Sequence, residues 1–502
     1  MSLTGISPPQ QPSKPAGFTS LHLSHYCGTT SPFHFSLPPG HQAVSCDNVS
    51  GTTRQAVRQA TRSSATFTTH HHTEYRNPCH EGPDQVPLVS PSSPVLGHQP
   101  LVPLVSTAAS LTSTMPAPTD IGRRNAIPII HTSGTYYEVG FDVGRTFRGI
   151  IEDFLASTAE LNETLLPAYE TEAGRAAYDA TLASLQENFP HYVRELQGTA
   201  DGARVPFHHL MLLHMDQSVP KAAGMGREAG TNGCSSVCTN YEDQVLLGHT
   251  EDALAETLNH VYLVSAHIEE EEPQGKLGTR KEGFTALCYA GHLPGFCMGY
   301  NHHGLVYSIN VIFPEKVVPG KTPRHFLTRA LLSAKTMEQG QQILRDRGTG
   351  SADGFSVNMS FTRQEGDHLF HNAEVGPTID GNESPMSILT ISPGEHHIHT
   401  NKFLRLTTIP EESGLCMDSS NHRHARAQDC CPPETRTALL ALLSDTHDEV
   451  HPFFREGVNS TIVKTVTLGV FDILERTWTI WMKNPRSSDS LVTLPLSFTW
   501  TD

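Results

Sequence analysis

The 502-residue sequence predicts an α+β fold in which antiparallel sheets are covered by helices. Three observations lead to this class. Helical patterns are grouped between residues 136 and 214, and most of the chain after residue 233 consists of short apolar or β-branched runs separated by turn residues. Residues 1–120 show neither pattern. Sequential hairpins build antiparallel sheets, and the grouped helices can cover their faces.

The first 120 residues are rich in Ser, Thr, Pro, Gln and His and lack periodic apolar runs. A segment of this composition cannot bury enough surface to offset the entropy of ordering it. We therefore expect a disordered extension at 1–120, a first part of the folded domain at 121–233 and a second part at 234–502. Met115 lies just before the ordered pattern and could serve as an alternative translation start.

Charge and cysteine usage limit the class of protein. The net charge is −17, and all of the acidic excess lies after residue 115, which argues against binding to nucleic acid or anionic membranes. No window approaches 18 unbroken apolar residues, and the first residues lack a signal-peptide core, so we expect no transmembrane helix and no secretion. The ten cysteines are scattered without a CxxC pair, so reduced thiols and a cytoplasmic location are expected.

The helices are expected in a first group and a few later segments. Tyr136 to Leu155 has amphipathic spacing, and Gly140 and Gly144 lie four residues apart on one face, where they permit close backbone packing. Pro206 and Pro323 stand at first-turn positions. In chain order the expected helices are 136–155, 171–187, 192–200, 206–214, 323–344, 419–427 and 433–443.

The strands, except for one near residue 127, follow residue 233. Each is a short run of β-branched, aromatic or small apolar residues bounded by turn signals. In chain order the expected strands are 127–131, 234–240, 245–250, 260–268, 284–290, 296–300, 305–312, 355–361, 368–375, 396–401, 463–473 and 477–482.

The stretch TNGCSSVCTNYEDQVLLGHTED, residues 231–252, carries the candidate chemistry. Its pattern predicts two strands joined by a polar turn. Gly233 lets the backbone before Cys234 adopt shapes that other residues avoid, and Asp252 lies one hairpin away. A cysteine at the head of a strand with such a partner is a candidate nucleophile with an orienting acid. The alternative is a buried structural cysteine, which is also the expectation for Cys238.

This arrangement resembles the self-processing cysteine hydrolases of the N-terminal nucleophile superfamily. Within it, the similarity is to the family that holds penicillin acyl-coenzyme A acyltransferase and insect β-alanyl-dopamine hydrolase. Members cut their own precursor before a cysteine in an Asn-Gly-Cys or Asp-Gly-Cys context, which places the bond here between Gly233 and Cys234. GHTEDALAETLNH, residues 248–260, is especially similar to the insect hydrolase. The resemblance covers about residues 127–485 and implies a four-layer αββα sandwich of the N-terminal nucleophile hydrolase type.

Three further motifs match this family in the same order. In HIHTNKFL, Asn401 takes the position of an asparagine that helps to form the oxyanion site, while Lys402 replaces the usual histidine. In SSNHRHAR, Arg423 takes the position of an arginine beside the nucleophile. FSVNMSF and HNAEVGP place Asn358 and Glu374 as supporting residues. From the residues alone, Asn401 could equally be a turn residue and Arg423 a surface arginine.

These residue types are sufficient for amide hydrolysis. Cleavage before Cys234 would free its α-amine, whose reference pKa of about 7.7–8.0 suits a general base, so no histidine partner is required. The resemblance then implies that Arg423 lowers the pKa of the thiol, Asp252 orients the ammonium form of the α-amine, and Asn401 donates to the oxyanion. No phosphate loop or dinucleotide fingerprint is present, and no cofactor is expected.

The resemblance implies a self-processing amidohydrolase of small β-alanyl amines, such as N-β-alanyl-dopamine or β-alanyl-histamine (carcinine), whose two fragments remain associated. Glu251 and Glu256 add carboxylates near Asp252 that could recognise the ammonium of a β-alanyl group. Two alternatives are an acyltransferase that uses an amine as acceptor, and an uncleaved, catalytically silent binding protein on the same fold.

The segment after residue 415 offers a different possibility. Two histidines and three cysteines there could form a zinc site. Adjacent cysteines rarely match the spacing of tetrahedral ligands, and the same stretch carries the Arg423 motif, so we expect no metal. The residues concerned are Cys416, His422, His424, Cys430 and Cys431.

Overall fold

The computed structural model describes residues 122–226, 233–456 and 462–498. The extension expected to be disordered, residues 1–120, lies outside this part of the chain, as does Asn232 of the expected cleavage motif. The division at residues 120 and 233 therefore stays a prediction.

The strands follow the expected order, and two further strands, β10 and β14, are present. They are β1 Ile129–Gly134, β2 Gly233–Tyr241, β3 Gln244–Leu254, β4 Val261–Gln274, β5 Thr279–Tyr289, β6 Met298–Asn301, β7 Leu305–Ile312, β8 Gly354–Phe361, β9 Phe370–Val375, β10 Met386–Ile391, β11 Glu395–His399, β12 Val463–Asp472, β13 Thr477–Trp481 and β14 Val492–Pro495.

The helices fall into a large N-terminal group and two later pairs. They are α1 Tyr136–Thr146, α2 Arg148–Ser157, the π-helix η1 Glu160–Leu165, α3 Leu166–Glu170, α4 Glu172–Asn188, α5 Pro190–Ala203, α6 Phe207–Leu213, α7 Ser218–Ala222, the 3-10 helix η2 Ala255–Thr257, α8 Arg324–Leu331, α9 Met337–Arg345, α10 Leu415–Asp429 and α11 Arg436–Leu443.

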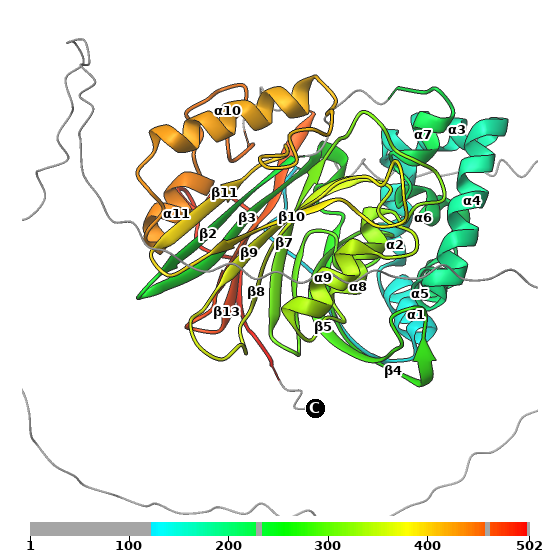
Figure 1. The fold of residues 1–502 in the computed structure, drawn as a ribbon, viewed down its shortest axis with the longest axis horizontal. Coiled ribbons are helices and arrows are strands. Elements are labelled where there is room, and N and C mark those ends of the chain that lie inside the picture. The colour runs from blue at the N-terminus through cyan, green and yellow to red at the C-terminus, as the bar shows by residue number, and fades with distance from the viewer. Residues whose placement is uncertain (1–121, 227–232, 457–461, 499–502) are drawn as a thin grey trace, which may run out of the picture. The chain divides into compact units, whose positions relative to one another are not determined.

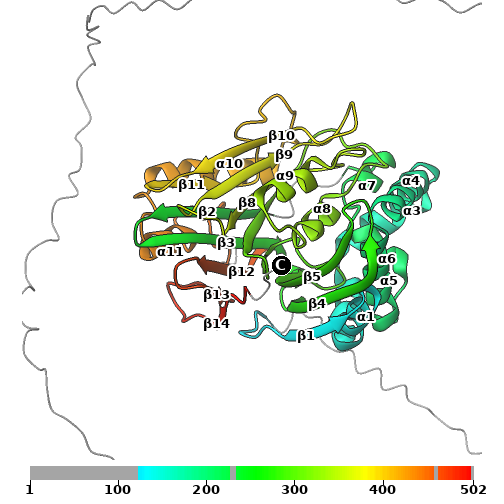
Figure 2. The same cartoon turned by 60° about the horizontal axis from the view of Figure 1, so that its bottom comes forward.

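Two sheets stack between two layers of helices, which is the four-layer αββα sandwich expected from the resemblance (Figure 1). Sheet 1 has the order β1-β4-β5-β6-β7-β8-β9-β10, and sheet 2 has the order β11-β2-β3-β12-β13-β14. β1 pairs with β4 in parallel, and the other neighbours are antiparallel. Figure 2 shows α10 and α11 outside sheet 2 and α1–α7 on the opposite side, beyond sheet 1.

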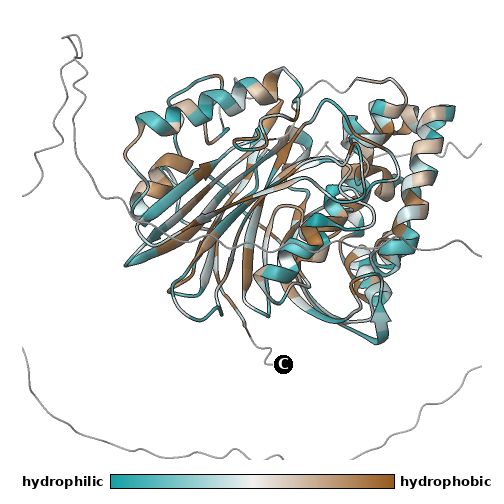
Figure 3. Ribbon diagram, in the orientation of Figure 1, coloured by the Kyte–Doolittle hydropathy of each residue, from teal (hydrophilic) through white to brown (hydrophobic). Residues whose placement is uncertain are grey.

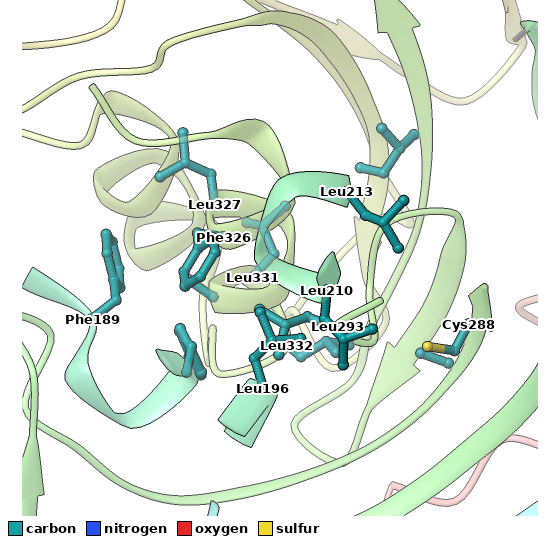
Figure 4. Packing of buried hydrophobic residues seen from close by; sticks show 14 of the residues in the cluster. Phe189, Leu196, Leu210, Leu213, Cys288, Leu293, Phe326, Leu327, Leu331 and Leu332 are labelled. Atoms are coloured by element: carbon teal, nitrogen blue, oxygen red, sulfur yellow. The ribbon is translucent and has the colours of Figure 1, made fainter. Parts of the chain in front are cut away.

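Separate apolar cores hold the layers together. The core between sheet 1 and its helices includes Phe189, Leu196 and Phe326 (Figure 4). The cores between the two sheets and between sheet 2 and its helices draw on opposite faces of the same strands. Cys238 of β2 faces sheet 1, as expected for a packing cysteine, and its neighbour Val237 packs toward α11. Because β2 is buried on both faces, a side chain on either face meets protein rather than water.

The two glycines predicted to permit close packing do bring α1 against α5. A Cβ atom at Gly140 would lie 1.9 Å from the Glu195 carbonyl oxygen, and one at Gly144 would lie 2.1 Å from that of Thr199. Two glycines of α5 approach α1 in the same way. Any larger residue at these positions would have to separate the helices.

Two helices expected to be continuous are each broken in two. The segment 136–155 divides at Phe147 into α1 and α2, and 323–344 divides before α9. At the second break, the Thr336 hydroxyl accepts the backbone N–H of Gln339, so an N-cap starts a new helix where amphipathic spacing predicted continuation.

Two strands, β10 and β14, are missing from the sequence-based expectation because both are edge strands with partly exposed side chains. Such strands lack the continuous apolar signal that reveals central ones. Across the described ranges, no helix has the length and apolar character needed to cross a membrane.

Candidate active site

The β2–β3 hairpin sets the geometry of the site. Its register pairs Cys234 with Glu251 and Gly233 with Asp252. Residues directly opposite each other share a face of the sheet, and successive residues alternate. Cys234 and Glu251 therefore face sheet 1, whereas Asp252 faces the layer that contains α10. All three side chains are buried, with 3% of Cys234 and 5% of Glu251 exposed.

Asn401, just beyond β11, contacts both the nitrogen and the sulfur of Cys234. Its Oδ1 accepts the Cys234 backbone N–H at 2.9 Å, and its Nδ2 lies 3.1 Å from Cys234 Sγ. The same Nδ2 donates to the Val311 carbonyl at 2.9 Å, which holds the amide in this orientation. The thiol donates to the Ile309 carbonyl at 3.4 Å. A carbonyl carbon bonded to this sulfur would therefore have an N–H donor close to its oxygen.

Arg423 of α10 ties the nucleophile strand to Asn401. One guanidinium nitrogen donates to the Cys234 carbonyl at 2.6 Å and to Ser235 Oγ at 2.8 Å, and the other donates to Asn401 Oδ1 at 2.7 Å. Its Nε donates to Ser419 Oγ at 3.1 Å. The polar character of α10, visible beside the apolar α11 in Figure 3, reflects this role because its inner face meets polar groups.

Asp252 lies beside the backbone that leads into Cys234. A Cβ atom at Gly233 would be 3.9 Å from Asp252 Oδ2. Its Oδ1 accepts the Thr465 hydroxyl at 2.6 Å, and its Oδ2 is 3.4 Å from Arg455 Nε. Together with Arg423, this gives two arginines and one carboxylate on the α10 side of the hairpin.

Glu251 lies on the other face of the hairpin, and its carboxylate has a tyrosine and a histidine as hydrogen-bond partners. The Tyr289 hydroxyl donates to its Oε1, and His249 Nε2 is 2.9 Å from its Oε2. His249 Nδ1 is in turn 2.8 Å from Ser236 Oγ. Within the part of the chain that the structure describes, no lysine or arginine forms an ion pair with Glu251.

The uncleaved chain keeps the thiol of Cys234 protonated. Burial raises the pKa of this thiol well above its ordinary value, and the nearby charge of Glu251 raises it further. The hydrogen bond from Asn401 and the charge of Arg423 lower the pKa, but they do not outweigh burial. A protonated thiol is a weak nucleophile, so repeated attack on a substrate carbonyl requires a base that takes its proton.

Tyr289 also contributes to the lining of a small cavity. Its volume is about 20 Å³, and its lining includes Leu254, Tyr289, His292, Phe296 and His325. Burial lowers the pKa of His292 to about 4, so this histidine is neutral at pH 7. The lining thus combines aromatic side chains with the charged side chains of Glu160, Asp216 and Arg324.

The structure places the two weaker candidates, Asn358 and Glu374, in supporting positions rather than beside Cys234. Asn358 bonds Asn310 at 2.8 Å and Ser308 at 3.4 Å, and Ser308 contacts Ser236 of β2 at 3.0 Å. It belongs to a buried polar chain between the sheets.

Glu374 holds the segment that follows Asn401. Its carboxylate accepts the backbone N–H groups of residues 404–406 at 2.7–3.0 Å, and His399 Nε2 lies 3.1 Å away. Burial opposes ionisation, but these hydrogen bonds outweigh it and lower the pKa of Glu374 to about 2. Lys402, which departs from the family pattern, points outward and donates to Asn421 Oδ1 at 2.9 Å.

The stretch considered for zinc does not gather its ligands. Cys416 packs with Val311 and Phe313, and His422 hydrogen-bonds Asp448 at 2.8 Å. Among the residues with described positions, no three His, Cys, Asp or Glu side chains are arranged to hold a metal ion.

The sequence analysis missed His249, Tyr289 and Arg455. A signal for His249 was present, because a tight turn after Tyr241 sets the register of the hairpin and the alternation of β3 puts His249 on the face of Glu251. Tyr289 and Arg455 come from distant segments, and nothing local to them indicates the contact.

Comparison with known proteins places the chain in a family. The sequence profile of the family described as Acyl-coenzyme A:6-aminopenicillanic acid acyl-transferase matches residues 239–487. Beta-alanyl-dopamine/carcinine hydrolase from Drosophila melanogaster is 43% identical over 380 residues, which cover 75% of this chain and 98% of that protein. The chain belongs to this acyl-transferase family. The resemblance inferred from the sequence is thus confirmed. Asp252, Asn401 and Arg423 lie inside the range matched by the acyl-transferase profile, and Cys234 lies just before it.

Solved structures similar to this member of the acyl-transferase family include a cysteine-to-alanine mutant of conjugated bile acid hydrolase from Clostridium perfringens. Its TM-score is 0.31 and its identity 10%, over 53% of this chain and 92% of the other. Penicillin V acylase from Agrobacterium tumefaciens gives a TM-score of 0.28 and 14% identity, over 51% of this chain and 84% of the other. Family membership rests on the Drosophila relative, because likenesses this distant carry no further argument.

Proposed function

We propose that this protein is a cysteine amidohydrolase that matures by cutting itself between Gly233 and Cys234 and then hydrolyses β-alanyl amines. The identity with the Drosophila hydrolase supports the reaction and substrate class. The structural observation that carries the proposal is the double contact of Asn401 with the nitrogen and the sulfur of Cys234. One amide group can thereby hold the α-amine that cleavage frees and stabilise the oxyanion that forms when the sulfur attacks a carbonyl carbon.

Maturation starts with attack of the Cys234 sulfur on the carbonyl carbon of Gly233. The C–N bond between the two residues breaks, the acyl group moves to sulfur, and the thiol proton ends on the freed α-amine. Water then hydrolyses the thioester, which releases the Gly233 carboxylate and restores the thiol. Asp252, beside this backbone, is placed to hold the α-ammonium that results.

Catalysis then uses the new α-amine as the base that the buried thiol requires. The amine takes the thiol proton, the sulfur attacks the substrate carbonyl, and the proton passes to the departing amine. Asn401 Nδ2 donates to the oxyanion, a contribution of about 3–4 kcal/mol in comparable sites. Water hydrolyses the β-alanyl thioester to β-alanine. Arg423 acts by holding the Cys234 carbonyl and Asn401 in place.

The two fragments are expected to stay together after cleavage. β1, which precedes the cut, pairs with β4 from Ile129 to Gly134. Arg329, which follows it, is buried between Glu195 of α5 at 2.8 Å and Glu282 of β5 at 2.6 Å. The shared strand pair, ion pair and apolar core all cross from one fragment to the other. A cytoplasmic setting suits the seven cysteines in the described ranges, all of which are free.

Intact mass measurement and a hydrolysis assay on the purified chain test the proposal. We expect a C-terminal fragment that begins at Cys234, and release of β-alanine from N-β-alanyl-dopamine or β-alanyl-histamine. An active preparation that remains one uncut chain would contradict the mechanism. A processed chain that releases no β-alanine would contradict the substrate class. A chain that stays whole and inert would fit the silent binding protein.

Acyl transfer to an amine is the second candidate, because the matching family is named for an acyltransferase. The processed protein would be incubated with an acyl thioester and an acceptor amine, and the N-acyl amine would be compared with the free acid. An excess of N-acyl amine would favour transfer, whereas free acid as the main product supports hydrolysis.

A further inference from the structure

Glu251 is the carboxylate directly across the hairpin from the nucleophile, and the steps above give it no role. The register pairs it with Cys234, and both side chains face sheet 1. We propose that Glu251 binds the ammonium group of the acyl half of the substrate and so selects β-alanyl amides. This inference rests on the proposed function and names the residue that determines its specificity.

The separation of the two side chains suits a β-alanyl group. Cross-strand partners in an antiparallel pair have Cβ atoms about 4.5–5.5 Å apart. The ammonium nitrogen of β-alanine lies three bonds from the carbonyl carbon, roughly 4 Å in an extended conformation with ordinary bond lengths. An acyl group held on the Cys234 sulfur can therefore span the gap to β3, where the carboxylate of Glu251 lies.

The carboxylate of Glu251 can accept further hydrogen bonds from a ligand. Each oxygen has one partner, the Tyr289 hydroxyl on Oε1 and His249 Nε2 on Oε2. A carboxylate can accept about four hydrogen bonds, so each oxygen keeps acceptor capacity. The two partners also hold the carboxylate in one orientation, which lowers the entropy lost when a ligand binds.

The charge around Glu251 favours a cationic ligand. Asp252, the next residue, is 3.4 Å from Arg455, whereas no lysine or arginine in the described ranges pairs with Glu251. A buried carboxylate without a cation is costly, and a ligand ammonium would supply the missing charge.

Glu256 is the natural competitor and provides a matched control. It follows the end of β3 in η2, is half-buried, and its Oε1 accepts the backbone N–H of Ala159 at 3.4 Å. Its carboxylate is therefore engaged with the helical layer and not with the hairpin face that bears Cys234.

The test compares two amides of one amine, the β-alanyl and the propionyl amide, which differ only by the ammonium group. The ratio of their kcat/KM values is measured on processed wild-type protein and on the Glu251→Gln, Tyr289→Phe and Glu256→Gln variants. Because both substrates meet the same preparation, the ratio does not depend on how much of a variant matures. Intact mass confirms that each variant is cleaved.

We expect the wild-type protein to prefer the β-alanyl amide, and Glu251→Gln to reduce that preference by about 10²–10³-fold while it still cleaves the propionyl amide. Tyr289→Phe keeps the carboxylate but loosens it, so a loss of about tenfold is expected, and Glu256→Gln should leave the ratio unchanged. If Glu251→Gln keeps the wild-type ratio, or if only Glu256→Gln changes it, the inference is overturned and the proposed function stands. If Glu251→Gln fails to mature, a wild-type ratio in Tyr289→Phe overturns the inference and a reduced ratio supports it. Equal cleavage of both amides by the wild-type protein overturns the inference and shows that hydrolysis is not selective for β-alanyl amides.

Discussion

The two faces of the β2–β3 hairpin carry opposite electrostatic arrangements. On the face toward α10, Asp252 is accompanied by two arginines: Arg455 lies 3.4 Å from its carboxylate, and Arg423 lies close enough for the two charges to interact. On the face toward sheet 1, Glu251 is bonded to Tyr289 and His249 without a lysine or arginine from the described residues. Cys234 stands between them, because its backbone meets the first group and its sulfur meets the second face.

This difference suggests a division of labour. The face with the two arginines orders the backbone around Gly233 and Cys234, where peptide cleavage and the new α-amine are expected. On the face toward sheet 1, Glu251 has no lysine or arginine partner among the described residues, so this face is suited to binding a cationic substrate. Variants on the first face should therefore affect all substrates alike, and variants on the second should alter selectivity.

The largest effect is expected from Cys234→Ala, which removes the group that both faces serve. The variant should remain one chain and release no β-alanine, because both the cleavage and the hydrolysis need the sulfur. A denaturing gel, intact mass and the β-alanine assay are the measurements. Detection of a fragment that begins at residue 234 in this variant would show that another group cuts the chain.

Asn401→Ala should lower turnover by about 10²–10³-fold, the usual cost of removing an oxyanion donor. The loss should be equal for β-alanyl and propionyl amides, because the contact is to the reacting atoms and not to the ammonium. Processing must be quantified first, since a failure to mature would imitate lost catalysis. Wild-type kcat in matured Asn401→Ala would remove this residue from the mechanism.

His249→Gln should act on the other face and more weakly. His249 orients one oxygen of Glu251 at 2.9 Å, and a hydrogen bond to a charged group is worth about 1.5–3 kcal/mol. We expect KM for the β-alanyl amide to rise about tenfold while kcat/KM for the propionyl amide stays near the wild-type value. Equal losses for both amides would indicate that His249 supports the fold rather than selectivity.

The smallest effect concerns acid stability through Glu374, remote from both faces. Because its pKa is about 2 in the folded chain and about 4.3 in the unfolded chain, it stabilises the fold above the unfolded value. That stabilisation is lost as the pH falls from about 4.3 toward 2, and amounts to at most about 3 kcal/mol.

Denaturant unfolding of Cys234→Ala with and without Glu374→Gln would measure this term on an uncut chain. The difference in the free energy of unfolding between the two proteins should shrink as the pH is lowered through this window. A difference that is independent of pH would mean that Glu374 does not titrate with the assigned pKa.

Local patterns in the sequence were enough for the class of fold and the order of most elements. Central strands such as β7 are rich in β-branched and aromatic residues between turn signals, and the Gly140 and Gly144 spacing correctly indicated close helix packing. The motifs around Cys234, Asp252, Asn401 and Arg423 identified the family, because spacing along the chain is a property that a sequence displays directly.

Only the tertiary structure decided what each of these groups meets. Arg423 lies 189 positions from Cys234 in the chain, and Asn401 lies 167 positions away, yet both touch it. That no lysine or arginine in the described ranges pairs with Glu251 likewise follows from the folded positions of the residues and not from their order in the sequence. Electrostatic partners are set by distances of a few ångströms, and those distances exist only once the helices and sheets have packed together.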